Sequence, residues 1–153
     1  MIRDHQRLST MLGDLSLDAR VAEDGVWVGV PSQRRGSVAV QIVPTERTVT
    51  FRAFIMRAPD LAHHDVYRRL LRKNHDAGPW AFSLDALGDV FLVAKHPSTA
   101  LDAETLDGLL GALSAHVDEV FEGIVRAGFG VDPGPTRESV VALAPGEVWR
   151  EEH

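Results

Sequence analysis

The chain has 153 residues, of which 44% are hydrophobic and 25% are charged, and these values predict a single globular domain with a sizeable core. It contains no cysteine, which excludes disulfides, cysteine-ligated zinc, iron–sulfur clusters and thiol nucleophiles. Its formal net charge of −6 argues against a nucleic acid partner, because binding to phosphates requires an excess of lysine and arginine.

The N-terminal residues are too polar for a signal peptide, and no apolar run is long enough to span a membrane. We therefore expect a cytoplasmic protein without a membrane partner. Apolar residues at helical spacing predict a first short helix over residues 2–13, which ends near Gly13.

Three stretches rich in β-branched and aromatic residues follow, at residues 26–31, 38–43 and 48–56, and turn-forming residues separate them. Such residues favour strands, and short turns favour antiparallel pairing of consecutive strands. The three stretches therefore predict three antiparallel strands in a row.

The hydrophobic period changes at residues 60–75, where leucine and valine recur at helical spacing. Asp60 follows a proline and is expected to cap the start of this second helix. Gly78 suits the left-handed position just after the helix, and the following proline cannot continue it.

Residues 80–84 and 90–94 alternate again and predict a hairpin around the sequence DALGD, with Gly88 at positive φ. Asp85 and Asp89 flank this turn, where an aspartate accepts hydrogen bonds from neighbouring amides. The two carboxylates are therefore explained by the turn and are not predicted to be a catalytic pair.

An apolar stripe from Leu106 to Ile124 predicts the longest helix, with Asp102 or Thr99 as its N-cap and Gly128 as its end. Residues 129–153 have three prolines and no helical period, which predicts a linker and a tail. The sequence SVVAL (139–143) and Trp149 could dock on the domain or on a partner.

We therefore expect one domain over residues 1–128, with elements in the order α-β-β-β-α-β-β-α. The fold class is α+β, with an antiparallel sheet of about five strands and helices packed on one face.

Two-residue alternation sends several large apolar side chains to the sheet face that the helices leave uncovered. Together they would make a patch of several hundred Å², on the order of the size that marks an interaction surface. The sequence leaves open whether the tail or a second subunit covers this patch. The candidates for partner binding or a dimer interface are Trp27, Val43, Phe54, Met56, Phe91 and Val93.

Charge is segregated between the second helix and the last one. The second helix carries Arg68, Arg69, Arg72 and Lys73, whereas the last one is mostly acidic. Helices of opposite charge can pair across a dimer or steer a charged partner, so the four basic residues are candidates for steering.

The histidines do not form a recognisable chemical site. His63 and His64 are adjacent on a helix and point in different directions, and His116 with Glu119 is a single pair at metal-ligand spacing without a matching second pair. No nucleophile elbow, phosphate loop or dinucleotide-binding motif occurs. We therefore predict no catalytic residue, no metal site and no cofactor.

Three segments carry a resemblance to a known family: YRRLLRKNH, GPWAFSLDALGDVFLVAKHP and LDAETLDGLLGALSAHVDEVF. They contain a helix ending in Leu-x-x-x-Asn, an aromatic-Ala-Phe strand, a Gly-Asp turn and a leucine-rich helix that begins Leu-Asp. Over residues 5–128 the chain resembles the YbjN-like family of bacterial proteins, which is described as regulating sensory transduction.

That family is similar in fold to the class I chaperones of type III secretion systems. These chaperones dimerise and hold partner segments in extended form along apolar grooves. The resemblance implies that Trp27, Phe54, Met56, Phe91 and Val93 are contacts for a partner.

The preferred hypothesis is a non-enzymatic homodimer that holds a protein or peptide partner on its sheet face or sheet edge. A regulatory domain that senses a small molecule between the sheet and the helices is the first alternative. An enzyme that uses dispersed histidines is the second.

Overall fold

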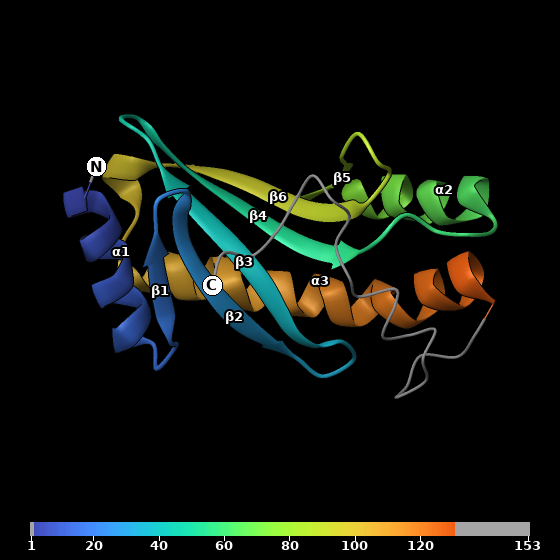
Figure 1. Ribbon diagram of the computed structural model, residues 1–153, viewed down its shortest axis with the longest axis horizontal. Helices are drawn as coiled ribbons and strands as arrows, with labels where there is room; N and C mark the ends of the chain where they lie inside the picture. The colour runs from blue at the N-terminus through green and yellow to red at the C-terminus, as the bar shows by residue number, and fades with distance from the viewer. Residues whose placement is uncertain (1, 131–153) are drawn as a thin grey trace.

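The computed structural model describes residues 2–130, which form one antiparallel sheet of six strands and three α-helices (Figure 1). The elements are α1 (Ile2–Asp14), β1 (Ala19–Ala22), β2 (Gly25–Ser32), β3 (Gly36–Pro44), β4 (Thr48–Met56), α2 (His63–Asn74), β5 (Ala81–Leu84), β6 (Val90–Pro97), a short 3-10 helix (Ser98–Ala100) and α3 (Ala103–Phe129). The strands lie in the order β1-β2-β3-β4-β6-β5. The predicted α+β class is confirmed, and β1 is an additional edge strand.

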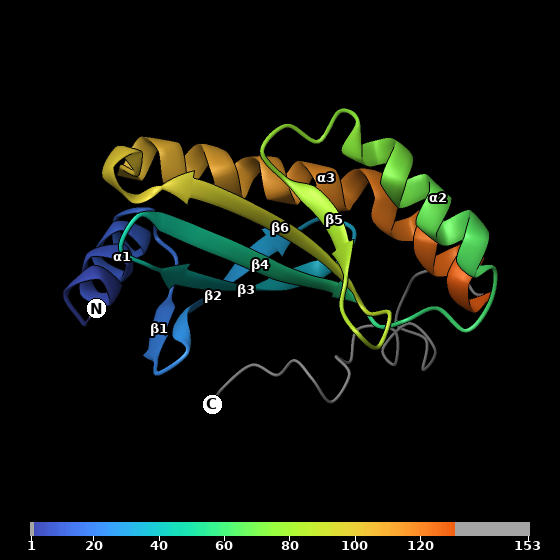
Figure 2. The same ribbon diagram turned by 90° about the horizontal axis from the view of Figure 1, so that it is seen from above.

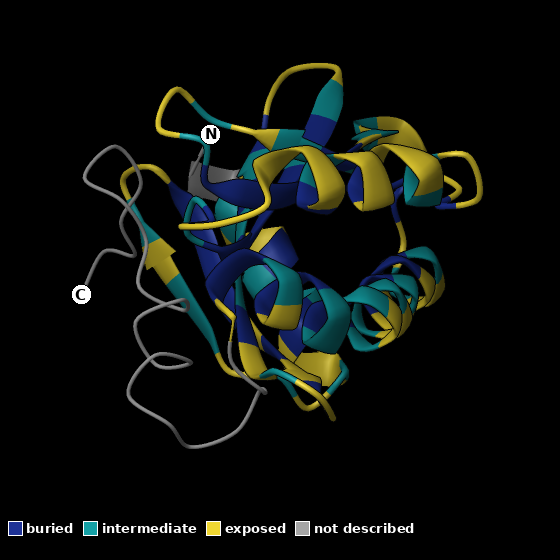
Figure 3. Cartoon of the chain, turned by 90° about the vertical axis from the view of Figure 1, so that its right-hand side faces the viewer, coloured by how far each residue is buried: buried dark blue, intermediate teal, exposed yellow. Residues whose placement is uncertain are grey.

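The helices pack on one face of the sheet. Figure 2 shows α3 running across the sheet, with α2 beside the C-terminal half of α3 and α1 near β1. Leu12 of α1, Leu70 of α2 and Leu113 of α3 all enter the same buried core. In Figure 3 the buried residues lie where the sheet and the helices face each other, and the outer faces of the helices are exposed.

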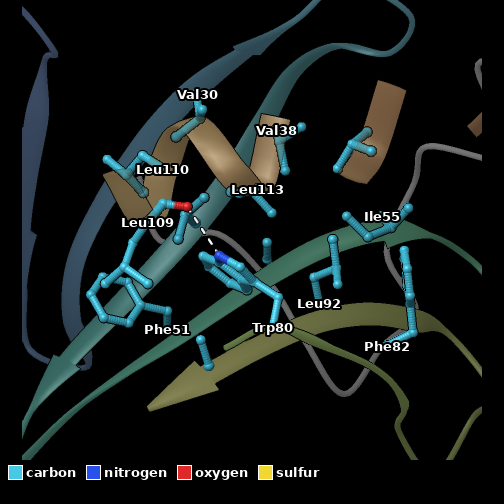
Figure 4. Packing of buried hydrophobic residues seen from close by; sticks show 14 of the residues in the cluster. Val30, Val38, Phe51, Ile55, Trp80, Phe82, Leu92, Leu109, Leu110 and Leu113 are labelled. Atoms are coloured by element: carbon cyan, nitrogen blue, oxygen red, sulfur yellow. Dashed lines mark hydrogen bonds between the residues drawn. The ribbon is translucent and has the colours of Figure 1, made fainter. Parts of the chain in front are cut away.

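Trp80 links the sheet to α3 at the centre of this core (Figure 4). Its indole N–H donates a hydrogen bond to the carbonyl of Leu109 on α3, at 3.0 Å. Its ring meets Phe51 of β4 edge-on, with 6.0 Å between the ring centroids. The tryptophan of the predicted hairpin is therefore a core residue with a satisfied donor.

The hairpin between β5 and β6 is closed by aspartates, as the sequence predicts. The Asp85 carboxylate accepts hydrogen bonds from the amides of Leu87 and Asp89, at 2.9 and 3.0 Å, and Gly88 has a φ of 84°. The Asp89 carboxylate has a further role, because it is buried and accepts from the amide of Ala58 at 2.8 Å.

The predicted start of α2 is wrong by a few residues. The helix begins at His63 after Ala62, which has a φ of 52°, and Asp60 lies outside it. The Asp60 carboxylate instead forms an ion pair with Arg57 at 2.9 Å. This pairing lowers the pKa of Asp60, chiefly through the hydrogen bond from the Arg57 guanidinium.

The predicted end of α3 at Gly128 is also wrong. The helix continues to Phe129 and ends at Gly130, whose φ is 69°. Gly128 instead allows a close approach: its carbonyl accepts hydrogen bonds from the amides of Asp60 and Leu61, and a Cβ at this position would lie 2.8 Å from the Cβ of Pro59. The other end of α3 is as expected, since the Asp102 carboxylate accepts from the amide of Thr105 at 2.7 Å.

Candidate functional site

One row of side chains crosses all six strands on the face of the sheet opposite the helices, which we name the second face. Figure 1 is seen from this side, with α3 behind the strands. Residues that pair directly in an antiparallel sheet point to the same side. The row runs through the pairs Arg20–Trp27, Trp27–Gln41, Gln41–Arg52, Arg52–Val93 and Val93–Ala81.

An aromatic cluster occupies the middle of the second face. Trp27, Phe54 and Phe91 form a group of buried side chains separate from the main core, each with no more than 2% of its surface exposed. Phe54 and Phe91 meet edge-on, with 5.6 Å between their centroids. Within residues 2–130 every member of the cluster comes from a strand and none comes from a helix; its half-buried neighbours are Ala22, Ala39 and Val93.

Four of the six candidate residues therefore lie together, namely Trp27, Phe54, Phe91 and Val93. Val43 is half-buried two positions along β3 from Gln41, on the same face.

Met56 does not belong to this set, and its expected placement is wrong. The pairing of β4 with β6 shifts register between Phe54 and Met56, so that both Ile55 and Met56 enter the main core on the helix side.

Arginines lie over the aromatic rings of the second face. The Arg52 guanidinium carbon is 4.2 Å from the centroid of Phe91, and that of Arg35 is 5.7 Å from the centroid of Phe54. Burial lowers the pKa of Arg35 to about 10, so its guanidinium stays charged at neutral pH. Burial also lowers the pKa of Arg52, and the charge of Asp85 opposes this effect. The second face thus combines cations with aromatic rings.

Asp24, just before β2, fixes two polar members of the row. Its carboxylate accepts the indole N–H of Trp27 at 2.9 Å, and its carbonyl accepts from the Gln41 amide at 2.9 Å. Trp27 is therefore held with its donor satisfied at one edge of the cluster. The sequence shows no motif for this arrangement, because Asp24 lies in the turn before the strand.

Two acidic residues of α3, Asp118 and Glu122, contact the β2–β3 turn within the same chain. Asp118 accepts hydrogen bonds from the Ser32 hydroxyl at 2.5 Å and the Arg34 amide at 3.1 Å, and Glu122 pairs with Arg34 at 2.9 Å. These contacts fix the β2–β3 turn to α3.

The basic residues of α2 are divided between internal pairs and solvent. Lys73 contacts Glu119 of α3, and its hydrogen bond lowers the pKa of that carboxylate. Arg69 pairs with Asp65 one turn earlier in α2, at 3.2 Å. Arg68 and Arg72 are exposed, and within residues 2–130 neither forms an ion pair. Opposite charges on α2 and α3 therefore meet inside one subunit, and two of the four steering candidates point to solvent.

The outer edge of β5 is occupied by a side chain of α2. The amide of Phe82 donates to Asn74 Oδ1 at 2.6 Å, and Asn74 Nδ2 donates to the Phe82 carbonyl at 3.2 Å. Asn74 thus takes both hydrogen bonds that an added strand would use at Phe82. Asn74 is the asparagine of the Leu-x-x-x-Asn motif described above. The motif alone does not indicate that this side chain binds the backbone of Phe82.

An apolar groove lies beside this edge and was not predicted. Its volume is about 100 Å³, and it is lined by Tyr67, Leu70, Leu71, Phe82, Ser83 and Leu84. Leu71 and Leu84 expose 70% and 44% of their surfaces. The helical period of α2 places Leu71 next to the buried Leu70, but the sequence alone assigns both to the core.

The histidines remain dispersed. His63 meets Tyr67 edge-on, and His116 lies half-buried on α3. In the part of the chain that the structure describes, no group of three or more histidine, aspartate or glutamate side chains is placed to hold a metal ion. Among the described helices, none has the length and apolar content needed to cross a membrane.

Residues 4–126 match the protein family YbjN, described as "Putative bacterial sensory transduction regulator". An uncharacterized protein of Mycobacterium tuberculosis (strain H37Rv) is 35% identical over 108 residues, which cover 71% of this chain and 59% of the relative. A second uncharacterized protein, from Mycobacterium leprae, is 31% identical over 102 residues, covering 67% and 55%. The chain thus spans less than two thirds of the length of the curated relatives it matches.

Solved structures share the fold. YbjN from E. coli aligns with a TM-score of 0.58 and 16% identity, covering 75% of this chain and 89% of that one. A chain of the ExoU–SpcU complex, from the type III secretion system of Pseudomonas aeruginosa, aligns at 0.54 and 17%, covering 76% and 98%. A chain of the HopA1–SchA chaperone–effector complex aligns at 0.52 and 13%, covering 78% and 98%. The fold is that of type III secretion chaperones.

Proposed function

Because the chain belongs to the YbjN family and has a type III secretion chaperone-like fold, we propose that it is a non-enzymatic protein-binding module whose second face holds the partner. The observation that carries this proposal is the set of half-buried side chains on the second face, Ala39, Gln41, Arg52 and Val93, which surrounds the buried cluster of Trp27, Phe54 and Phe91. Aromatic residues and arginine are the side chains that contribute most to binding energy at protein interfaces.

The chemistry of the second face indicates the kind of segment it fits. The half-buried apolar side chains Ala39 and Val93 favour an apolar peptide, and Arg52 favours acidic residues within it. At the β5 edge, the Asn74 contacts with Phe82 disfavour strand addition. The sheet face is therefore a better surface for a partner than the β5 edge.

Peptides selected from a random 12-residue library against the full chain test this proposal. We expect the selected peptides to combine aliphatic and acidic residues, and their affinity to fall by about tenfold in Arg52→Glu, which reverses a charge over Phe91. Fluorescence polarisation measures the affinity, and circular dichroism confirms that the variant is folded.

Arg72→Glu is the matched control, since it makes the same change of charge on exposed α2. We expect it to leave peptide affinity within twofold. If Arg72→Glu weakens binding and Arg52→Glu does not, α2 is the binding surface and the proposal for the second face is wrong.

We further propose that the chain is a homodimer joined at the groove beside β5. Leu71 lines this groove and exposes 70% of its surface, so a two-fold axis lets the Leu71 side chains of two copies pack against each other's groove. Asn74 already satisfies the Phe82 backbone, so this contact uses side chains rather than strand pairing.

Sedimentation equilibrium at micromolar concentration is expected to give twice the chain mass of 16.8 kDa for the wild type. Leu71→Glu is expected to shift the protein to the monomer, because it places a charge in an apolar contact. Leu87→Glu makes the same change at another exposed leucine, in the β5–β6 turn, and is expected to remain dimeric. A monomeric wild type would contradict this proposal.

A further inference from the structure

We propose that the chain binds a free amino acid with an aliphatic or thioether side chain, in a pocket at the end of the molecule opposite α2. Figures 1 and 2 show α1, the β3–β4 turn and the 3-10 helix together at this end. The pocket lies between these three segments and has a volume of about 180 Å³. It shares no residue with the aromatic cluster or with the groove beside β5, so this inference goes beyond the proposed function.

The floor of the pocket is apolar. Leu8 of α1, Val49 of β4 and Leu101 before α3 line it, and each exposes no more than 3% of its surface. Met11, half-buried on α1, extends this floor. These side chains come from separate elements of the main core or pack against it, so the fold holds the floor in place. Such a floor favours an apolar group on the bound molecule.

Charged side chains of both signs line the pocket above this floor. They are Asp4 and Arg7 of α1 and Glu46 of the β3–β4 turn, and all three are exposed. Asp4 and Arg7 are three positions apart on a helix, a spacing at which opposite charges can pair. In the described part of the chain, however, none of the three residues forms an ion pair. Their charges are therefore available to a bound molecule.

Arg7 is positioned by one contact and keeps most of its donors. Its Nη2 donates a hydrogen bond to the carbonyl of Leu101, at 3.0 Å. This bond ties the guanidinium to the segment that carries part of the apolar floor. A guanidinium has several N–H donors in a fixed plane, so others remain for a carboxylate, which it can bind through two parallel hydrogen bonds.

Hydrogen bonds also fix the wall that carries Glu46. The amide of Ser98 in the 3-10 helix donates to the carbonyl of Arg47 at 2.9 Å, and its hydroxyl donates to the carbonyl of Glu46 at 3.3 Å. Within the turn, the Thr45 hydroxyl donates to the carbonyl of Thr48 at 2.9 Å. The turn and the 3-10 helix are therefore joined, which preorganises this side of the pocket.

The charges of the pocket indicate the chemical class of the bound molecule. A simple amine would meet the positive charge of Arg7, and a simple carboxylic acid would meet the carboxylates of Asp4 and Glu46. An amino acid instead carries a carboxylate for the arginine and an ammonium for the acidic residues. The volume is below the roughly 300–1,000 Å³ of sites for drug-sized molecules, which disfavours a nucleotide or an extended peptide.

Titration of the isotope-labelled full chain with L-leucine, L-isoleucine, L-valine and L-methionine, followed by NMR, tests this proposal. We expect at least one of the four to bind with a Kd below about 10 mM, and its amide shifts to concentrate at pocket residues such as Leu8, Glu46 and Thr99. The amide of that amino acid lacks the carboxylate, and its deaminated analogue lacks the ammonium. Each is expected to bind at least about tenfold more weakly.

Arg7→Gln tests the carboxylate contact. We expect it to weaken binding of the amino acid at least about tenfold and to leave binding of its amide within about twofold. Arg47→Gln is the matched control, because it makes the same change at an exposed residue of the β3–β4 turn that does not line the pocket. It is expected to leave amino acid affinity within about twofold. Circular dichroism shows whether each variant is folded.

The double variant Asp4→Asn, Glu46→Gln tests the ammonium contact and changes exposed residues only. It is expected to weaken binding of the amino acid and to strengthen binding of the deaminated analogue, because it removes two negative charges from the pocket. This variant keeps the proposal testable if Arg7→Gln does not fold.

Three results would overturn the inference. One is the absence of saturable shifts with all four amino acids. Another is equal binding of the amino acid, its amide and its deaminated analogue, since the charges of the pocket would then play no part in recognition. The third is an equal loss of affinity in Arg7→Gln and Arg47→Gln. None of these measurements involves the second face or the dimer, so they are separate from a failure of the proposed function.

Discussion

Replacing Trp80 with alanine is expected to lower the free energy of unfolding by about 3–5 kcal/mol, the range for removing a large buried aromatic side chain. Trp80 is 1% exposed and packs between the sheet and α3, where its ring meets Phe51. Its loss leaves a cavity at the centre of the core and frees the Leu109 carbonyl from its donor. Urea denaturation followed by circular dichroism measures the change.

Trp80→Phe is the control that separates packing from hydrogen bonding. Phenylalanine keeps an aromatic ring in the core but is smaller than tryptophan and lacks the donor to Leu109, so we expect a smaller cost of about 1–2 kcal/mol. If the alanine variant were no less stable than the phenylalanine variant, Trp80 would not be the link between the sheet and α3 that its contacts indicate.

Replacing Asn74 with alanine is expected to lower the free energy of unfolding by about 1–3 kcal/mol, because it removes two hydrogen bonds to Phe82 at once. It also opens the outer edge of β5 to pairing with other chains, so we expect the variant to aggregate more readily. Chemical denaturation measures the stability, and light scattering at raised concentration measures the aggregation.

Asn74→Asp keeps the acceptor for the Phe82 amide but sets an oxygen against the Phe82 carbonyl. Hydrogen exchange at the Phe82 amide is therefore expected to stay slow in the aspartate variant and to become fast in the alanine variant. Fast exchange of this amide already in the wild type would contradict the role that we assign to Asn74.

The strands from Val26 to Met56 are predictable because their apolar residues alternate, and alternation follows directly from the geometry of a strand. The short strand β1 was missed, since four residues with a central arginine carry too few alternations to identify it. The placement of Met56 failed for a different reason. A register shift changes the face of every later residue and leaves no mark in composition.

The ends of helices depend on contacts from distant parts of the chain. The sequence suggests Asp60 as the N-cap of α2. Its carboxylate instead pairs with Arg57, and α2 begins at His63. The sequence suggests that Gly128 ends α3. In the structure it lies inside the helix, where the absence of a side chain leaves room for Pro59. Likewise, the charges of α2 and α3 suggested a contact between subunits, and the fold places Lys73 beside Glu119 within one subunit.

The last turn of α3 and the connection from β4 to α2 are joined by the Gly128 carbonyl, which holds the amides of Asp60 and Leu61. The last turn of α3 therefore cannot shift without displacing the residues that lead into α2.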